Sequence, residues 1–246
     1  MDNSNLDLNG KIILVTGGSS GIGSQCAVTL SNCGAKLIIT GRNEANLRET
    51  MNKLSGEGHK FFTTDLTKED EIDDLISRLP KLNGVVFSAG VSQPRPTKFL
   101  NKKLIDDTFS VNVISVILLC GKLQSKKLLN HGASLVFISS AATKYPYIGG
   151  AMYTASKCAL DGYVKVLAME LAPKKIRCNT ISPNFVKTPL LGAEENIIME
   201  EAIEKHKNIH LLGMGEPQDV ASAVAFLISD EAKWVSGGNL FLGGGV

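Results

Sequence analysis

The sequence carries almost no surplus charge, because 26 Lys and Arg residues balance 24 Asp and Glu residues over 246 positions. No basic block is long enough to form a nucleic-acid footprint, which argues against a nucleic-acid partner. Apolar runs are short, and none reaches the ~18 residues that a bilayer-spanning helix needs. The first ten residues are polar and acidic and lack a secretory apolar region. We therefore expect a soluble, cytoplasmic protein with no membrane partner.

Cysteine is scarce, and its pattern excludes two kinds of site. The five cysteines are an odd number, with no CxxC motif and no Cys/His spacing typical of a metal site. The four histidines are scattered and stand in no partner motif. This pattern favours buried, reduced thiols over disulfides or zinc, and we expect no metal.

What the sequence does have is a regular alternation of short apolar runs with longer helical patterns. The runs lie at 11–17, 35–40, 59–65, 83–90, 133–140, 176–182 and 239–244. Such alternation predicts βαβ units and a parallel sheet that is covered on both faces. No linker, repeat or low-complexity stretch divides the chain. The sequence thus predicts an α/β fold, a single-domain, Rossmann-like, doubly wound parallel sheet over residues 1–246.

A glycine-rich stretch, TGGSSGIG, follows the first predicted strand and opens a helix. Glycines let the backbone turn sharply and approach a pyrophosphate, and the helix N-terminus offers N–H groups to the anion. A plain glycine-rich turn is the alternative, but the position between a strand and a helix favours dinucleotide binding. The cofactor contacts predicted in this loop are Gly17, Ser19, Ser20, Gly21, Ile22 and Gly23.

The end of the second predicted strand lacks the acid that normally binds the ribose of NAD. Gly41 occupies the expected position of that acid and Arg42 follows it. A guanidinium is therefore available to a 2′-phosphate through charge-assisted hydrogen bonds. An exposed loop arginine without a ligand is the alternative. We predict that Arg42 contacts the cofactor and that NADP(H) is preferred over NAD(H).

Tyr153 and Lys157 stand four positions apart in the stretch AMYTASKCAL. One helical turn would place them on the same face, where an ammonium would lower the pKa of the phenol. Such pairs are also common on solvated helix faces, so this pair alone is weak evidence. Tyr147 and Tyr163 have no lysine four positions later, which leaves Tyr153 as the candidate acid.

The patterns TGxxxGIG at 16–23 and YxxxK at 153–157 together resemble the short-chain dehydrogenase/reductase family over essentially the whole chain. The resemblance implies that Ser140, rather than its neighbour Ser139, is the catalytic serine, and that Asn112 is the active-site asparagine in a long helix. Tyr153 would then donate a proton to a carbonyl oxygen that Ser140 holds. Lys157 would also bind the nicotinamide ribose, and Asn112 would help to hold a water.

The resemblance also implies further cofactor contacts. Asp65 and Leu66 would contact the adenine, and Thr188 would contact the nicotinamide amide. The other implied contacts are Ser88, Ala89, Gly90, Tyr153, Lys157, Pro183 and Val186. Three positions depart from the family pattern, which has Asn for Ser88, Gly for Asn184 and Asp for Gly243.

The function that the resemblance implies is NADP(H)-dependent interconversion of a ketone and a secondary alcohol by hydride transfer. The general pattern is nearest to 3-oxoacyl-carrier-protein reductases. Reductases of sugars, steroids or other small carbonyl compounds remain alternatives, as does a non-catalytic dinucleotide-binding regulator. An epimerase of the extended branch would need an added substrate domain.

Two further expectations concern the substrate and the assembly. The substrate would be a small or acyl-carrier-bound carbonyl compound, enclosed by a lid near 189–214. The resemblance also implies a homo-oligomer, commonly a tetramer, formed through helices around 101–129 and 153–172.

Overall fold

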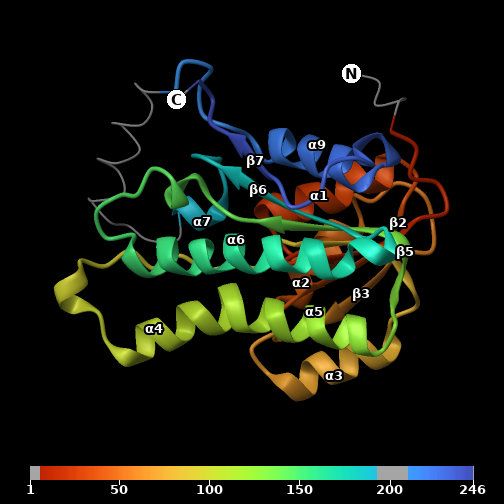
Figure 1. Ribbon diagram of the computed structural model, residues 1–246, viewed down its shortest axis with the longest axis horizontal. Helices are drawn as coiled ribbons and strands as arrows, with labels where there is room; N and C mark the ends of the chain where they lie inside the picture. Colours follow the sequence, from red (N-terminus) through yellow and green to blue (C-terminus); the bar gives the residue numbers. More distant parts are fainter. Residues whose placement is uncertain (1–5, 193–209, 246) are drawn as a thin grey trace.

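Seven parallel strands form one central sheet in the computed structural model of the protein, which describes residues 6–192 and 210–245 (Figure 1). The strands follow the order β3-β2-β1-β4-β5-β6-β7. Their bounds are β1 (Ile12–Thr16), β2 (Lys36–Gly41), β3 (Lys60–Thr63), β4 (Leu82–Phe87), β5 (Leu129–Ile138), β6 (Arg177–Pro183) and β7 (Asn239–Leu242). The prediction of a doubly wound, Rossmann-like fold is confirmed.

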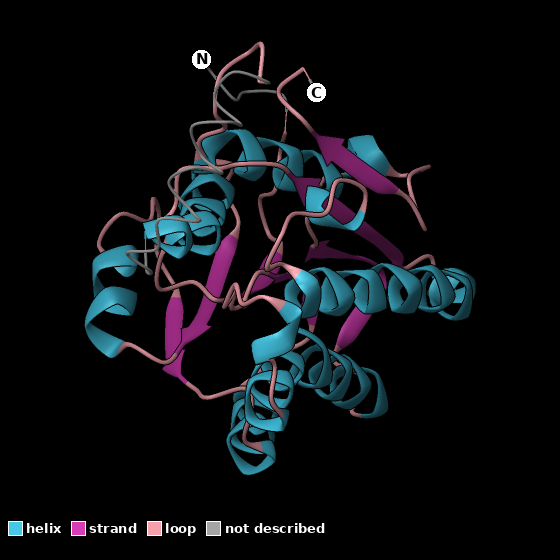
Figure 2. Ribbon diagram, turned by 90° about the vertical axis from the view of Figure 1, so that its left-hand side faces the viewer, coloured by secondary structure: helices cyan, strands magenta, loops and turns pink. Residues whose placement is uncertain are grey.

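Helices cover both faces of the sheet (Figures 1 and 2). They are α1 (Gly21–Asn32), α2 (Glu44–Met51), α3 (Glu69–Arg78), α4 (Lys102–Phe109), α5 (Ser115–Ser125), α6 (Ala151–Leu171), α7 (Pro189–Gly192) and α9 (Pro217–Ile228). One buried core cluster joins α1 and α9 to the sheet, and a second joins α3, α5 and α6 to the opposite face.

The central strand β1 explains why the chain packs on two sides. Its side chains alternate between the faces, so that Ile13 and Val15 join the first core cluster and Leu14 joins the second. All three are fully buried. A strand that is buried on both faces reads as a continuous apolar run, which is why its sequence shows no polar alternation.

The helical run Lys102–Ser125 is interrupted by a π-helical turn, Ser110–Ile114, between α4 and α5. Within the described part of the chain, it is the one helix long and apolar enough to cross a bilayer, with a mean hydropathy of 1.6. A core helix passes the same test, and Val116, Leu119 and Leu123 are buried in the second core cluster. We therefore assign it as a core helix of the domain.

The cysteines are all free thiols. Four of them are buried, as expected, whereas Cys158 on α6 is exposed. Burial raises the pKa of the Cys26 thiol to about 12, so it is an inert apolar group at neutral pH.

Sheet order determines where a ligand site can form. The chain crosses from β1 to β2 on one side and returns to β4 on the other, so the loops after β1 and β4 diverge at the carboxyl edge of the sheet. Such a switch point leaves a crevice between the two loops, and ligands of open α/β sheets bind there.

Candidate active site

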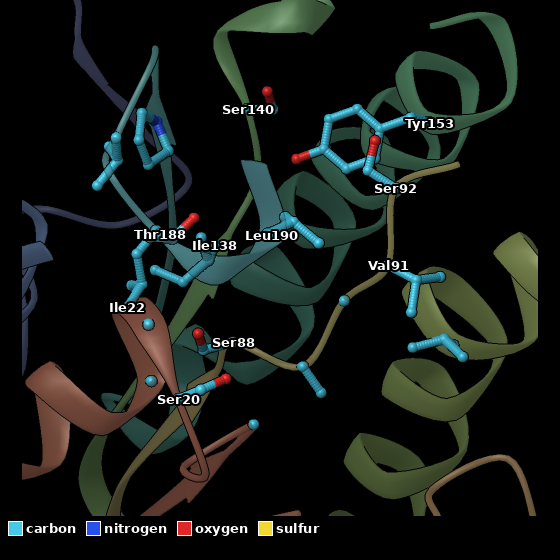
Figure 3. Close-up of a pocket in the computed structure, with 18 of the residues that line it drawn as sticks. Ser20, Ile22, Ser88, Val91, Ser92, Ile138, Ser140, Tyr153, Thr188 and Leu190 are labelled. Atoms are coloured by element: carbon cyan, nitrogen blue, oxygen red, sulfur yellow. The ribbon is translucent and has the colours of Figure 1, made fainter. Parts of the chain in front are cut away.

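A cavity of about 460 Å³ opens at the carboxyl edge of the sheet, lined by the loops that follow β1, β2, β3, β4, β5 and β6 (Figure 3). It brings together Ser140 and every predicted cofactor position. Those positions are Gly17, Ser19, Ser20, Gly21, Ile22, Gly23, Arg42, Asp65, Leu66, Ser88, Ala89, Gly90, Tyr153, Lys157, Pro183, Val186 and Thr188. Asn112 is the one predicted site residue that is not part of the lining.

The loop after β1 needs glycine at two positions. Gly17 has a φ of +68°, and a Cβ there would lie 2.8 Å from the backbone of Ala89. A Cβ on Gly23 would lie only 2.2 Å from the carbonyl oxygen of Gly17. The N-cap residue of α1, Ser20, makes no side-chain cap hydrogen bond. The first-turn N–H groups are thus left to an anion, and the loop fits a pyrophosphate.

A hydroxyl, Thr16 Oγ1, joins the ends of β1 and β4. It accepts hydrogen bonds from the N–H groups of Ser88 at 3.1 Å and Ala89 at 3.3 Å. Ser88, which stands where the resemblance implies asparagine, is therefore braced through its backbone. Sequence reasoning missed Thr16, because it looked for the brace in the side chain at position 88.

The end of the cavity formed by the loops after β2 and β3 carries the guanidinium of Arg42 and, among the described lining residues, one carboxylate, Asp65. Burial acts to raise the pKa of Asp65, but hydrogen bonds from Thr67 and the charge of Arg42 outweigh it and hold that pKa below its usual range. A Cβ on Gly41 would lie 3.1 Å from Ser19 Oγ. A hydroxyl thus stands close to the place where an NAD site would carry its acid.

Lys157 is buried on α6 and lies close to the Tyr153 ring. Its Nζ lies 5.6 Å from the ring centroid and donates a hydrogen bond to the carbonyl oxygen of Ile138 at 2.8 Å. Burial lowers the pKa of Lys157 to about 8, and the charge of Asp161 opposes that effect. The group is therefore not the permanent cation that its residue type suggests.

The phenol of Tyr153 is held mainly in its protonated form. Burial raises its pKa to about 12, whereas a hydrogen bond with Ser140 acts in the opposite direction. Desolvation of the phenol outweighs that hydrogen bond. That Lys157 and the positive charge of an oxidised nicotinamide together lower this pKa stays a prediction.

Ser140 caps the short 3₁₀ helix that follows β5. Its Oγ accepts a hydrogen bond from the N–H of Ala142 at 3.1 Å. Figure 3 shows Ser140 and Tyr153 at the same end of the cavity. The neighbour, Ser139, is 2% exposed, and its Oγ has no hydrogen-bond partner. Of the two serines, Ser140 is thus the one that shares a hydrogen bond with the phenol.

Asn112 lies in the π-helical turn and is 1% exposed. Its Oδ1 accepts from the N–H of Val91 at 2.8 Å, and its Nδ2 donates to the Val91 carbonyl at 2.9 Å and to Ser156 Oγ at 3.0 Å. The amide therefore braces the loop after β4 from behind the cavity wall. A water contact at this residue stays a prediction.

One serine and one tyrosine that belong to no sequence motif also line the cavity. Ser92 follows β4, Tyr147 precedes α6, and their hydroxyl oxygens lie 3.4 Å apart. Neither residue stands in a motif, so only their nearness in sequence to Gly90 and Tyr153 could have drawn attention to them.

The predicted lid at 189–214 is described only in part, since 193–209 lie outside the described residues. Its two stems are held together by backbone hydrogen bonds. The N–H of Lys187 donates to the carbonyl of Gly215 at 2.9 Å, and the N–H of Gly215 donates to the carbonyl of Phe185 at 2.9 Å. Both stems therefore start from a fixed base beside Thr188, which lines the cavity.

Comparison with known proteins gives consistent matches over the whole chain. A family model described as "Enoyl-(Acyl carrier protein) reductase" matches residues 17–246. A 3-oxoacyl-[acyl-carrier-protein] reductase of Rickettsia felis is 32% identical over 241 residues, 98% of each chain. The 7alpha-hydroxysteroid dehydrogenase of Escherichia coli K12 is 31% identical over 99% of this chain and 97% of its own. The solved structure of a short-chain dehydrogenase/reductase (glucose/ribitol dehydrogenase) from Brucella melitensis has a TM-score of 0.90 at 26% identity, with 98% of each chain covered.

Proposed function

The chain belongs to the short-chain dehydrogenase/reductase family and is an oxidoreductase that acts on CH–OH groups with NAD(P), and we propose that it is an NADP(H)-dependent carbonyl reductase. The observation that carries the proposal is the shared cavity. Ser140, Tyr153 and Lys157 line it together with the glycine loop, although they come from distant parts of the sequence.

The residues present fit a dinucleotide. The glycine loop leaves no room for a Cβ at Gly17 or Gly23, where a backbone must approach a pyrophosphate closely. Arg42 lines the other end of the cavity without an acid at position 41. The presence of Arg42 and the absence of an acid at position 41 together support a preference for NADP(H). When bound, the cofactor supplies the hydride, and the protein binds, orients and protonates.

Ser140 and Tyr153 perform the proton chemistry in this proposal. The Ser140 hydroxyl holds the carbonyl oxygen, and the phenol of Tyr153 gives that oxygen a proton. A pKa of about 12 keeps the phenol protonated at neutral pH, which suits a proton donor in reduction. After the transfer, the charge of the Lys157 ammonium, whose Nζ lies 5.6 Å from the centre of the Tyr153 ring, stabilises the phenolate.

The physiological substrate is a small or acyl-carrier-bound carbonyl compound in our proposal. The Rickettsia relative is named for a 3-oxoacyl carrier substrate and the E. coli relative for a hydroxysteroid, so both classes are candidates. Steady oxidation of NADPH with a panel of 3-oxoacyl thioesters, sugars and ketosteroids tests the proposal. A non-catalytic regulator would bind NADPH without consuming it, and such a result would overturn the catalytic assignment.

We also propose that residues 1–246 act as one domain in a cytoplasmic homo-oligomer. Apolar side chains remain exposed on the two long helices away from the sheet. They include Ile114, Ile117, Val166 and Met169, the last with 77% of its surface exposed. Contiguous exposed apolar surface on a soluble protein marks a contact site. Light scattering at micromolar concentration should give a tetramer, and a monomer would contradict the proposal.

A further inference from the structure

The buried side-chain oxygens that lack a hydrogen-bond partner within the described chain all lie along the seam between α6 and the sheet. They are Ser139 Oγ, Thr154 Oγ1, Asp161 Oδ1 and Ser182 Oγ. Ser139 follows β5, Ser182 belongs to β6, and the other two residues lie on α6. Buried polar groups are nearly always hydrogen-bonded to protein or to ordered water, so their gathering in one place has a physical cause.

Ser139 and Ser182 stand at neighbouring positions of adjacent strands. The parallel register pairs Ile138 with Ile181, and the N–H of Ser139 continues the ladder by donating to the Ile181 carbonyl at 2.7 Å. Both serines are 2% exposed, and their hydroxyls share no hydrogen bond. Adjacent strands lie about 4.8 Å apart, and one water molecule with two hydrogen bonds spans up to about 5.6 Å. The two hydroxyls are therefore spaced for a bridging water.

These two serines face α6. Phe137, two residues before Ser139, and Cys178, four residues before Ser182, both belong to the core cluster that packs against α6. Side chains alternate along a strand, so residues two or four positions apart point to the same face of the sheet. The two hydroxyls are thus directed at the helix that carries the candidate acid.

Thr154 reaches the same place from the helix. Because α6 leads into the parallel strand β6, the two run in opposite directions, and the first turns of α6 lie at the carboxyl edge of the sheet. Asp161 follows Thr154 by two turns on the same helix face, and it lines a cavity of about 60 Å³ with Thr180 of β6. Toward the carboxyl edge from that cavity, the same faces of α6 and β6 present Thr154 and Ser182. These two side chains are therefore neighbours across the seam.

We propose that the hydroxyls of Ser139, Thr154 and Ser182 together bind one ordered water molecule beneath the first turns of α6. A buried water typically makes about three hydrogen bonds, and each hydroxyl can donate or accept one. Ser139 also lines the active-site cavity, so water can reach the site from there.

This water joins the two segments that carry the proton chemistry. Ser139 is followed directly by Ser140, and Thr154 directly follows Tyr153. A water held from both sides fixes the candidate serine and the candidate phenol relative to each other. The three hydroxyl residues are therefore positioning residues. Their positioning role rests on the proposed function, whereas the water site itself does not.

The site is distinct from the water contact that the family resemblance implies at Asn112. The Asn112 amide nitrogen donates to the Val91 carbonyl and to Ser156 Oγ. Ser156 lies two residues after Thr154, so the two side chains leave α6 about 200° apart. The proposed water and Asn112 thus lie on different sides of the helix.

A double-mutant cycle in urea denaturation tests the water site. Thr154→Val and Ser182→Ala each remove one hydroxyl, and each should raise the equilibrium constant for unfolding about 3- to 10-fold, the loss of one hydrogen bond. The double variant should raise it by less than the product of the two single effects, because either substitution already disturbs the shared water. Thr154→Ser keeps the hydroxyl, so in that background Ser182→Ala should have its full effect.

Ser222→Ala is the control for this cycle, because Ser222 lies on α9, which packs on the opposite face of the sheet. Its effect should multiply with that of Thr154→Val. The water site is overturned if the effects of Thr154→Val and Ser182→Ala are independent. It is also overturned if either substitution lowers the equilibrium constant for unfolding, which is the result for a hydroxyl that is buried with no partner at all.

The rate of reduction tests the positioning role separately. With methyl acetoacetate and saturating NADPH, Thr154→Val and Ser182→Ala should lower kcat about 10-fold, less than the roughly 100-fold that a 1 Å misplacement costs. KM for the ketone and Kd for NADPH should stay within about twofold, and Thr154→Ser should keep the wild-type kcat. An unchanged kcat in both hydroxyl-removing variants overturns the positioning role. A wild-type protein that oxidises no NADPH with any ketone overturns the proposed function and the positioning role, while the denaturation cycle still decides the water site.

Discussion

The ammonium of Lys157 lies 5.6 Å from the centre of the Tyr153 ring. Its hydrogen bond goes to the carbonyl oxygen of Ile138. Lys157 therefore acts on the phenol of Tyr153 through its charge rather than by transferring a proton to it. Burial moves the two pKa values in opposite directions, to about 12 for the phenol and about 8 for the ammonium.

The first prediction concerns the pH dependence of reduction. Because the pKa of Lys157 is about 8, the fraction of protein that carries the ammonium falls as pH rises through that value. We expect kcat/KM for ketone reduction to fall above pH 8 with a single-proton dependence. Lys157→Arg should move this fall to higher pH. A wild-type profile that is flat between about pH 7 and 10, the range around that pKa, would contradict the assignment.

The second prediction concerns stability. The pKa of Lys157 in the folded protein is about 8, below its unfolded value near 10.5. Burial of the charged form therefore lowers the free energy of unfolding by its full amount below pH 8. This penalty fades as pH rises from 8 toward 10.5. Lys157→Met removes this penalty of about 3 kcal/mol and loses one hydrogen bond worth about 1 kcal/mol.

Urea denaturation at neutral pH should therefore show the Lys157→Met variant to be more stable than wild type by about 1–2 kcal/mol, while it is inactive. The advantage should vanish near pH 10. A variant that is less stable than wild type at neutral pH would show that the burial of this ammonium is not costly.

The third prediction compares two glycines. Gly23→Ala would place a Cβ 2.2 Å from the carbonyl oxygen of Gly17, so the loop must move and its affinity for NADPH should fall by at least about 100-fold. Gly121→Ala is the matched control, because a Cβ on this α5 residue meets nothing within 4 Å. It should raise the free energy of unfolding by about 0.5–1 kcal/mol. Fluorescence titration with NADPH measures the first effect and urea denaturation the second. Equal NADPH affinities for the two variants would show that the loop does not need glycine for the cofactor.

The fourth prediction concerns the cofactor preference. Arg42 supplies a positive charge at one end of the cavity, and the neighbouring position 41 is a glycine instead of an acid. We expect wild type to bind NADPH about ten- to thirtyfold more tightly than NADH, from one charge-assisted contact. Arg42→Ala should abolish the difference. Equal affinities in wild type, or a preference that survives the substitution, would mean that Arg42 does not contact the 2′-phosphate.

The fold and the local motifs were predictable because their causes are local in sequence. The run Ile13–Val15 is apolar because β1 is buried on both faces, and Gly23 is needed because it lies next to Gly17 in the turn. A strand, a turn and a helix follow one another directly there. The order of residues in this segment is therefore enough to predict its structure.

Other features depend on contacts between distant segments, and the sequence could not supply them. The amide of Asn112 braces Val91 from a π-helical turn that no pattern marks. Burial raises the pKa of Tyr153, and the spacing to Lys157 does not reveal that burial. The Ser92–Tyr147 pair exists because two loops meet, and neither loop carries a motif.

The most direct test is the steady-state rate of NADPH oxidation with a 3-oxo ester, measured for wild type and Tyr153→Phe. The substitution removes one hydroxyl at the cavity wall and leaves the ring in place. We predict that kcat falls by about 10²- to 10⁴-fold, the range for loss of a positioned proton donor, while the Kd for NADPH stays within about twofold. Near-normal turnover by Tyr153→Phe would contradict the assignment of this phenol as the acid and, with it, the proposed mechanism.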